Sequence, residues 1–358
     1  MSAHSILITV MAAFAAFGAL DRILGNRFGL GKQFEEGILA MGSLALAMVG
    51  IISFSPVLAT LLRPVVVPVY TFLGADPAMF AGSILACDMG GGALAREMAN
   101  DKAVADLGGV LCGSMLGATI VFTIPVALGI LQEKDRPYLA KGALCGIVTI
   151  PVGILAGGLA AGYPVITVLR NLVPIVLLAL LIAVGLWKVE KAMIKGFTVF
   201  GKGVLAVITV GLAASIVEAL TGFVLIPGME SIEVGFGTVG EIAIVLAGAF
   251  PLVYAVTRIL NKPLMLLGKR LHINETAAAG LIASLANSIA TFGLIKDMDD
   301  RGKVVNVAFA ISAAFVFGDH LGFAAGFAPE MLLPMIIGKL TAGISAVAVA
   351  LVLTRKKR

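Results

Sequence analysis

Residues 75–102 read ADPAMFAGSILACDMGGGALAREMANDK, an apolar segment that contains one central carboxylate and three consecutive glycines. Gly90, Gly91 and Gly92 remove side-chain restraint from three successive backbone units, which favours an unwound break in a membrane helix over a continuous helix. Asp88 lies just before this expected break. Because a charge at the centre of a bilayer costs about 2.5–3.5 kcal/mol, an intramembrane carboxylate normally faces a cavity or a partner and marks a substrate or ion path.

The composition places the chain in a bilayer. Hydrophobic residues make up 59% of the sequence and charged residues only 13%, compared with about 25% charged residues in soluble proteins. About ten stretches reach the roughly 20 apolar residues that a span requires. The sequence therefore predicts an all-α, polytopic membrane protein with about 9–11 helices and no sizeable soluble domain.

Charge and cysteine content exclude two other classes of site. The formal net charge is +5, but the basic residues fall in short loops beside apolar runs, including the terminal residues 355–358. This pattern indicates membrane topology rather than nucleic-acid binding. Cys87, Cys112 and Cys145 have no CxxC spacing, and the three histidines form no zinc motif, so we expect neither a metal site nor a cofactor.

Apolar runs and prolines set the expected helix boundaries. Arg63-Pro64 is expected to end the second helix and to leave an apolar piece up to Gly74 that is too short to cross a membrane. Trp187 lies where an interfacial anchor belongs, at the end of a very apolar run. Outside the broken segment, the expected helices of the first half cover about residues 5–23, 37–61, 104–131 and 139–161, and a very apolar helix at about 165–187 follows them.

The chain also carries an internal repeat. Gly222 lies 197 residues after Gly25, and Asn287 lies 199 residues after Asp88. Such an ordered set predicts two structural repeats, residues 1–161 and 197–358, joined by a transmembrane helix within residues 162–196. The other pairs, at 199 residues, are Arg63-Pro64 with Lys262-Pro263, Asp76 with Glu275, and Asp101-Lys102 with Asp300-Arg301.

Two arrangements of the broken element stay open. From Asp76 to Asp88 and from Asp88 to Asn100 the chain could form helices of about 18 Å each, just over half of a hydrocarbon core of roughly 30 Å. A hairpin would give nine crossings and two inverted repeats, whereas a crossing would give about eleven helices. The hairpin places the basic loops on one face and the loop with Glu230 and Glu233 on the other, as the positive-inside rule expects, so we favour it.

The first candidate site combines the two broken elements. If two re-entrant tips meet near the midplane, Asp88 lies opposite the amide and hydroxyl of Asn287 and Ser288, with unwound backbone carbonyls between them. Such a site suits a small cation that also carries hydrogen-bonding groups. The plain structural alternative is that Asp88 caps a half-helix and that the glycines permit close helix packing.

The second candidate is the run Gly318-Asp319-His320-Leu321-Gly322. It breaks the repeat, because the matching region of the first half carries Thr119 and Thr123 but no charge. An Asp-His pair can bind a cation, relay a proton or hold a gate, and the alternative is a buried pair that stabilises the contact between the repeats.

An enzyme was weighed against a transporter. Two intramembrane aspartates, Asp88 and Asp319, could imitate an intramembrane aspartyl protease. The Gly-x-Gly-Asp motif of that class is absent, because Val316 stands where its first glycine belongs, and serine or zinc protease spacing is also missing. A membrane sensor would need a signalling domain, and none is evident. We therefore expect a transporter and not an enzyme.

At ACDMGG, residues 86–91, and FGDHLGF, residues 317–323, the sequence resembles the ethanolamine utilization transporter (ethanolamine permease) family, and the likeness extends over essentially the whole chain. The resemblance implies a multi-pass inner-membrane permease that admits ethanolamine to bacterial cells. The family's first motif has an aromatic residue soon after the two glycines, whereas Gly92 and Ala93 follow here, which leaves room for an altered pocket. The expected substrate-binding residues are Asp88, Met89, Gly90, Gly91, Asn287, Ser288, Asp319 and His320.

The resemblance and the residues point to the same substrate chemistry. Ethanolamine is protonated at neutral pH and has one hydroxyl, so it requires a carboxylate and a hydrogen-bonding partner. The sequence thus predicts uptake by alternating access through a midplane site. A Na⁺- or H⁺-coupled transporter of another small amine or amino acid is the alternative. Coupling and oligomeric state stay open, although a homodimer would supply the fixed scaffold that a moving bundle needs.

Overall fold

The computed structural model describes residues 3–355, apart from the side chains of residues 3, 4, 260–264, 267 and 269. Every regular element within the described range is a helix, which confirms the all-α prediction. Segments long and apolar enough to span a membrane also confirm a polytopic membrane protein. The eight such segments are Ser5–Ile23, Leu30–Phe72, Lys102–Ile130, Glu133–Ala160, Val165–Lys188, Glu190–Thr221, Ile232–Ile259 and Pro329–Leu353.

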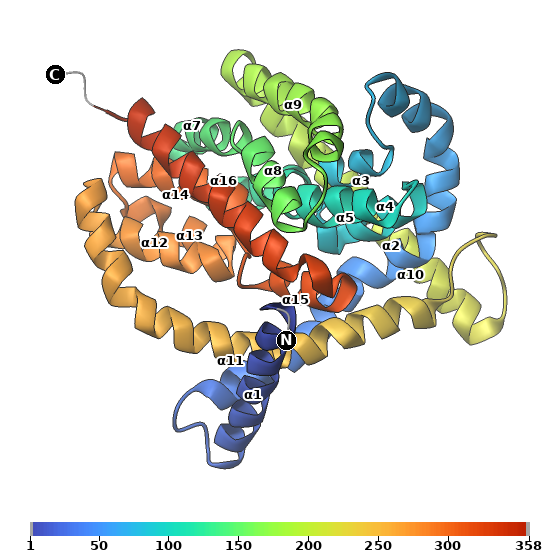
Figure 1. Cartoon of the computed structure of the whole chain (residues 1–358), viewed down its shortest axis with the longest axis horizontal. Coiled ribbons are helices and arrows are strands. Elements are labelled where there is room, and N and C mark those ends of the chain that lie inside the picture. Colours follow the sequence, from blue (N-terminus) through green and yellow to red (C-terminus); the bar gives the residue numbers. More distant parts are fainter. Residues whose placement is uncertain (1–2, 356–358) are drawn as a thin grey trace.

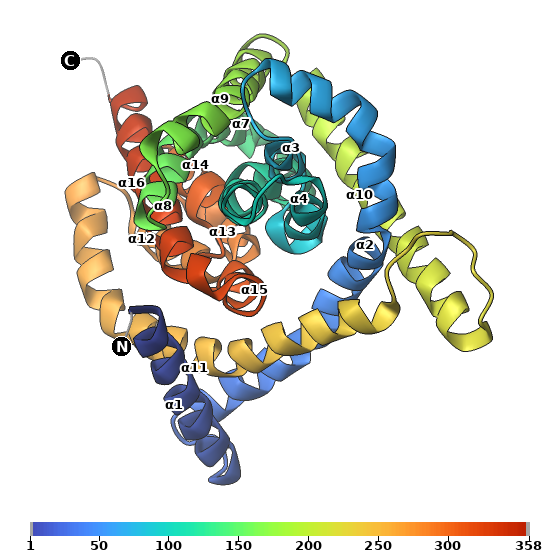
Figure 2. The ribbon, with the colours of Figure 1, turned by 45° about the vertical axis from the view of Figure 1, so that its right-hand side comes forward.

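The second helix is longer than expected. After α1 (Ala3–Ile23), α2 runs unbroken from Leu30 to Phe72 and includes Pro56, Pro64 and Pro68. The expected end at Arg63-Pro64 was therefore wrong. Each proline removes one backbone hydrogen bond and bends a helix without necessarily ending it, because membrane helices re-satisfy the freed groups through neighbours. Figure 2 shows α2 changing direction along its length as it follows the outside of the molecule.

Four helices, α1, α2, α10 (Glu190–Thr221) and α11 (Ile232–Leu271), form a frame along part of the periphery of the molecule. In Figure 2, α2, α10 and α11 run around a central group that includes α3, α4, α13 and α15. The two longest helices, α2 and α11, pack against each other; α10 packs mainly on α2, whereas α1 packs against both α11 and α2. Figure 1 shows the same long α11 passing below the central helices.

Glycines at matching positions let α2 approach α10 and α11 approach α1 closely. A Cβ atom on Gly50 of α2 would collide with the carbonyl oxygen of Ile208 in α10, and one on Gly248 of α11 would collide with the carbonyl oxygen of Met11 in α1. The two glycines lie 198 residues apart and their partners 197. The two halves thus use the same close approach, as the predicted repeat requires. A second matched pair is Gly37 against Ala247 and Gly235 against Val49.

Two equivalent helix caps identify which residues of the two halves correspond. Asp101 accepts a hydrogen bond from the backbone N–H of Val104 and so caps α5 (Lys102–Asp106), and Asp299 does the same for Gly302 in α14 (Asp300–Ala313). The structural counterpart of Asp101 is therefore Asp299, at 198 residues, and not Asp300. The side chains of Lys262-Pro263 lie outside the described residues, and the division of the chain at residues 161 and 197 stays a prediction.

Both broken elements are hairpins. The first comprises α3 (Ala78–Ile84), η1 (Cys87–Gly91) and α4 (Gly92–Met98). A carboxylate oxygen of Asp76 accepts hydrogen bonds from the backbone and side-chain N–H groups of Asn100, at 3.2 and 2.6 Å. The ends of this element thus meet, so the chain enters and returns at the same end rather than crossing.

The second broken element closes in the same way. It comprises α12 (Glu275–Ala286) and α13 (Ser288–Leu294). The backbone N–H of Asn274 donates to Asp299 Oδ1 at 2.8 Å, and its side-chain N–H donates to the carbonyl of Asp297 at 3.0 Å. These bonds join the residue before α12 to the loop after α13, so this element is a hairpin too.

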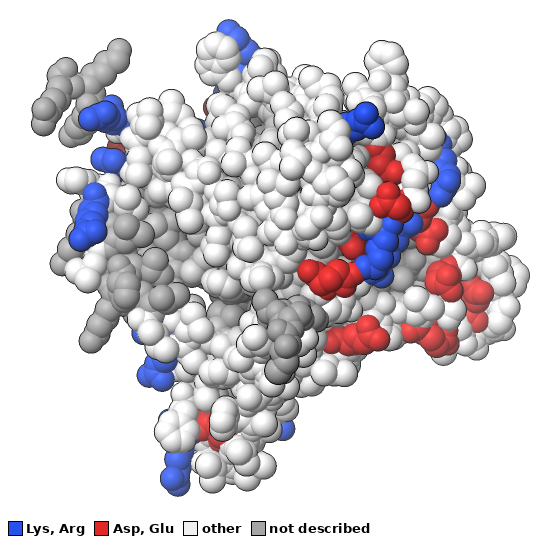
Figure 3. Space-filling model, viewed as in Figure 1, with Lys and Arg blue, Asp and Glu red and all other residues white. Residues whose placement is uncertain are grey.

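The hairpins enter from opposite ends of α16 (Leu332–Leu353). Lys102, which follows the first hairpin, forms an ion pair with Glu330, immediately before α16. Asp299, which follows the second hairpin, lines a cavity together with Thr354, immediately after α16. In Figure 3 the acidic side chains gather toward the right-hand end of the visible face. The charged side chains at its left-hand end are mostly Lys and Arg.

A ninth crossing is interrupted. The chain passes from Asp299 to Glu330 through α14 and α15 (Asp319–Phe327), and residues 314–318 between them are unwound. Backbone N–H groups of Phe315 and Phe317 donate to carbonyls at the end of α12, at 3.1 and 2.8 Å. The matching segment of the first half, residues 102–130, stays helical through the wide π-turns of η2 (Leu107–Gly117) and η3 (Thr119–Thr123).

Candidate functional site

A cavity of about 270 Å³ lies where the two hairpin tips meet the unwound crossing. The predicted site residues Asp88, Met89, Asn287, Asp319 and His320 all line it, although they come from three separate parts of the chain. The other three predicted residues, Gly90, Gly91 and Ser288, are buried and are not part of its wall. The hairpin fold thus brings the two sequence candidates into one site.

The first tip breaks earlier than expected. Leu85 and Ala86 are already extended, and Gly90 has a φ of +95°, so Asp88 lies inside the break rather than before it. The backbone N–H of Gly91 donates to the carbonyl of Ala86 at 2.8 Å and closes the turn. The glycines therefore shape the tip that presents Asp88.

Asp88 begins a chain of polar contacts that leads away from the cavity. Its side chain is 16% exposed, and its Oδ1 lies 3.8 Å from His320 Nε2. On the other side of the imidazole, Nδ1 lies 3.0 Å from Lys339 Nζ. Lys339, in the middle of α16, is 1% exposed and also donates to the carbonyl of Ser114. This places a buried ammonium behind Asp88, separated from it by one imidazole ring.

Asp319 is the second carboxylate of the cavity. Among the residues that the structure describes, no hydrogen bond or ion pair engages its side chain. It is the first residue of α15, where the helix dipole favours a negative charge. With Asp88 and Asp319 ionised and Lys339 protonated, these groups carry a net charge of minus one. A single monovalent cation would neutralise the site.

The second tip contributes an amide. Asn287 Oδ1 caps α13 by accepting from the backbone N–H of Ile289 at 2.7 Å, so the amide NH₂ is the part that stays available to a ligand. The hydroxyl of Ser288 is fully buried and has no hydrogen-bonding partner among the described residues. The hydrogen-bonding group that reaches the cavity from this tip is therefore Asn287 alone.

Two aromatic rings complete the wall. Phe122, from η3, and Phe315, from the unwound segment, both line the cavity and meet edge to face with 5.6 Å between their centroids. The ring of Phe315 also lies 5.2 Å from that of His320. Aromatic faces attract ammonium groups. Apolar residues are too common in this chain for the sequence to have singled out these two.

A metal site was considered at the same place. Cys87, Asp88 and His320 each offer one ligand atom, all within 4.8 Å of one another. The Lys339 ammonium contacts the same imidazole, however, and would repel a divalent cation held by it. The arrangement therefore favours a monovalent, hydrogen-bonding cation over a metal.

Comparison with known proteins identifies the family. Residues 3–353 match the family described as "Ethanolamine utilisation protein, EutH". The chain belongs to the EutH family. It is 59% identical over 356 residues to the probable ethanolamine permease EutH of Listeria monocytogenes, and 48% identical over 395 residues to that of Escherichia coli K12. The alignments cover 99% and 100% of this chain and 95% and 97% of those relatives.

A further relative, "Uncharacterized protein YxeR" of Bacillus subtilis, is 53% identical over 350 residues, 98% of this chain and 95% of that protein. No solved structure matches. Membership of the EutH family confirms the resemblance seen in the two motifs. The chain is therefore a transporter rather than an enzyme, and a multi-pass protein of the bacterial inner (plasma) membrane.

Lys339 was not among the predicted site residues, because the sequence indicates only a snorkelling side chain or a counter-ion at this position. A lone lysine within an apolar helix is a signal in itself, because intramembrane cations normally face the interior and find a partner. The sequence could not show that partner, since Asp88 and His320 lie far from Lys339 along the chain and approach it only through the hairpin and the broken crossing.

Proposed function

We propose that this EutH protein takes up ethanolamine, as a monovalent cation, through the cavity between the hairpin tips. The observation that carries the proposal is the composition of that cavity: its wall holds two carboxylates, one amide with a free NH₂ and two aromatic rings, and one buried ammonium behind the wall leaves a net charge of minus one. Its volume of about 270 Å³ is near the lower end of ligand pockets, which measure about 300–1,000 Å³. A short molecule with an ammonium at one end and a hydroxyl at the other matches it.

The two carboxylates take different parts in this proposal. Asp319 has no side-chain partner among the described residues and binds the ammonium group, with Phe122 and Phe315 beside it for cation–π contact. Asp88 accepts a hydrogen bond from the substrate hydroxyl, and the amide of Asn287 donates a hydrogen bond to the oxygen of that hydroxyl. Gly90, Gly91 and Ser288 support the two tips from behind.

Lys339 sets the charge that the site accepts. Without it the cavity would hold two uncompensated carboxylates, which would repel each other and favour a divalent ligand. With it, one positive charge is missing and the bound state is neutral. A neutral complex is also easier to move through the low-dielectric interior of a membrane protein than a charged one.

Alternating access is the proposed mode of transport. We assign residues 1–161 and 197–358 to two inverted repeats joined by residues 162–196, because the hairpins enter from opposite ends of α16 and the frame contacts recur. The central helices would move against the frame of α1, α2, α10 and α11 and so expose the tips to each side in turn. A homodimer through the frame would hold it fixed.

Accumulation of the substrate does not require a coupled ion. An inside-negative potential contributes about 2.3 kcal/mol per 100 mV to the entry of a monovalent cation, so uniport is sufficient for accumulation. The contacts from Asp88 through His320 to Lys339 favour one second candidate, proton-coupled transport of ethanolamine or of another small amine or amino acid, because such a chain can carry a proton.

Uptake of labelled ethanolamine into proteoliposomes tests the proposal. We expect the purified protein to accumulate ethanolamine when the lumen is made negative, and we expect Asp319→Asn to reduce that uptake at least 100-fold, because the only unpartnered carboxylate of the cavity is lost. Asp297→Asn, an exposed carboxylate outside the cavity, is the matched control and should transport normally.

The outcomes separate the candidates. Uptake that requires a pH gradient and ignores the potential would replace uniport by proton coupling. Normal uptake by Asp319→Asn would remove the ammonium-binding role from that residue. If the folded protein transports another amine but not ethanolamine, the proposed substrate is wrong.

A further inference from the structure

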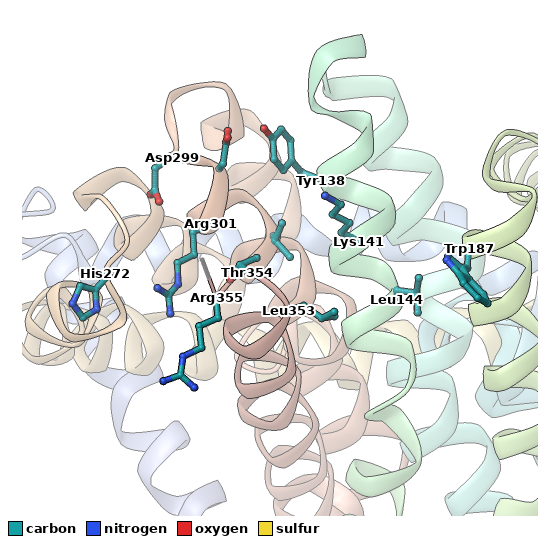
Figure 4. Close-up of a pocket in the computed structure, with 12 residues that line it drawn as sticks. Tyr138, Lys141, Leu144, Trp187, His272, Asp299, Arg301, Leu353, Thr354 and Arg355 are labelled. Atoms are coloured by element: carbon teal, nitrogen blue, oxygen red, sulfur yellow. The ribbon is translucent and has the colours of Figure 1, made fainter. Parts of the chain in front are cut away.

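A second, larger cavity lies away from the substrate site, at the end of the molecule where α14 begins and α16 ends (Figure 4). It measures about 1,270 Å³ and is lined by α7 (Arg136–Ile147), by the end of α9 (Val165–Lys188), and by the adjoining ends of α14 and α16. None of its lining residues belongs to the substrate cavity. We call it the basic cleft.

Three cations of the cleft lack protein partners. Lys141, Arg301 and Arg355 form no ion pair or hydrogen bond within the described part of the chain, and Arg301 Nε is buried without an acceptor. Lys303 is only two residues from Arg301 but is neutralised by Asp135, at 2.7 Å. Figure 4 shows the side chains of Arg301 and Arg355 extending in the same direction. The cleft therefore has unused donors for an anion.

The acidic residues of the cleft do not cancel these donors. Both carboxylate oxygens of Asp299 are already engaged, by the backbone N–H groups of Asn274 and Gly302. This leaves Asp300 as the one other carboxylate among the lining residues. The lining side chains therefore retain an excess of positive charge, and a guanidinium is well suited to a phosphate because its N–H groups match two oxygens at once.

Apolar side chains lie beside the cationic groups. Leu144, Val304 and Leu353 line the cleft, and Trp187 is at its edge, 70% exposed, with Lys188 Nζ 4.0 Å from its ring centroid. Tryptophan and lysine together mark the level of lipid headgroups in membrane proteins. A soluble phosphate would make no use of this apolar wall, whereas acyl chains would.

We propose that the basic cleft binds an anionic phospholipid of the cytoplasmic leaflet. The phosphate is held by Arg301 and Arg355, Lys141 adds positive charge from the opposite wall of the cleft (Figure 4), and the acyl chains lie along Leu144 and Leu353 toward the bilayer. Basic pockets between transmembrane helices are suited to such headgroups, and the cytoplasmic leaflet supplies them. This site is independent of the proposed transport activity, although it contacts the start of the crossing whose other half carries Asp319.

Native mass spectrometry of the full-length protein tests this site. The protein is purified in detergent and equilibrated with phosphatidylglycerol or phosphatidylcholine, and the retained lipid is counted. We expect preferential retention of phosphatidylglycerol, reduced at least tenfold in Arg301→Gln/Arg355→Gln. The matched control Lys134→Gln/Lys296→Gln removes two exposed cations that line neither cavity and should retain lipid like the native protein.

Each outcome decides the proposal. Equal retention by the two double variants, or no preference for the anionic lipid, would overturn it. If the arginine variant does not fold, as judged by its elution and melting in phosphatidylcholine, Lys141→Gln is measured instead and should lower retention on its own. Inorganic phosphate is added in a further arm; displacement of the lipid by millimolar phosphate would assign the cleft to a soluble anion.

Discussion

The two hairpins share one fold but carry different chemistry. The first presents Asp88 from a tip that turns at Gly90, whereas the second presents Asn287, which caps the returning helix. Behind the first, the crossing at residues 102–130 stays helical, and behind the second it unwinds at residues 314–318 and supplies Asp319 and His320. Matched glycine contacts occur in the frame of both halves, whereas the tips and the crossings differ.

Under the proposed repeat, the matched glycines are what the two halves share and the cavity is where they differ. Packing depends on backbone approach, and the same glycines serve it in both halves. A binding site for an asymmetric ligand cannot be symmetric, because one end of the ligand is charged and the other is not. Natural sequences depart from their own local rules mainly at functional sites, and here the departure supplies Asp319 and His320 in one half and Asp88 in the other.

Removing the carboxylate of the first tip should give the largest loss of uptake. Asp88→Asn makes the first tip like the second and leaves Asp319 and Lys339 to balance each other, so a bound ammonium would be uncompensated. We expect ethanolamine uptake into proteoliposomes to fall at least 100-fold, about 2.7 kcal/mol, with normal expression and folding.

The exchanged variant Asp88→Asn/Asn287→Asp then separates charge from position. It restores the net charge of the cavity but places the carboxylate on the tip that His320 does not contact. We expect uptake to stay low. Recovery to near the native rate would mean that only the charge count matters, and the assigned roles of the two tips would have to be abandoned.

The second prediction compares glycines of the two hairpins. Gly90 has a φ of +95°, and an added Cβ would collide with Ile51, whereas Gly293 of α13 has open space around it. We expect Gly90→Ala to lower the free energy of unfolding by about 1–3 kcal/mol and Gly293→Ala to leave it unchanged or slightly raised. Unfolding in mixed micelles with SDS measures both.

A further variant tests the cause of that loss. Ile51 is buried, so Ile51→Ala alone leaves a cavity and lowers the free energy of unfolding by about 2–5 kcal/mol. The comparison is therefore made within the Ile51→Ala background, where the collision is gone but the left-handed backbone stays. Gly90→Ala should destabilise the protein less in that background than in the native protein, but still measurably. Equal stability of Gly90→Ala and Gly293→Ala would show that the tip does not depend on the conformation of Gly90.

Most of the fold could be predicted from the sequence, because spans are long and apolar and the repeat fixes their order. Hydropathy alone could not separate the hairpins from crossings, because it does not encode whether Asp76 meets Asn100; the positions of the basic loops favoured the hairpin. The helix boundary at Pro64 was wrong for a similar reason. A proline signals a lost hydrogen bond, but only neighbouring helices decide whether the helix continues through it.

Intramembrane polar residues could be proposed as site candidates from the sequence, but neither Lys339 nor the phenylalanines could be placed beside them. Asp88, Asp319 and His320 stand out as intramembrane polar residues, and Asn287 follows from the repeat. Phe122 and Phe315 are two of 19 phenylalanines, with no local signal to separate them from the core. Whether a backbone glycine lines the cavity or lies behind it depends on the direction of the turn, which the sequence does not specify.

The smallest predicted effect compares the continuous crossing with the unwound one. Phe122 is contributed by the helical crossing of the first half, so its ring can be shortened without disturbing the strained segment that holds Phe315, where φ is +64°. A partly desolvated cation–π contact contributes about 1 kcal/mol, so Phe122→Leu should raise the KM for ethanolamine about fivefold with little change in maximal rate. Phe250→Leu, outside the cavity, controls for lost packing. Equal KM values for Phe122→Leu and Phe250→Leu would mean that the ring of Phe122 does not help Asp319 to bind the ammonium. Any aromatic contribution would then come from Phe315, in the unwound segment.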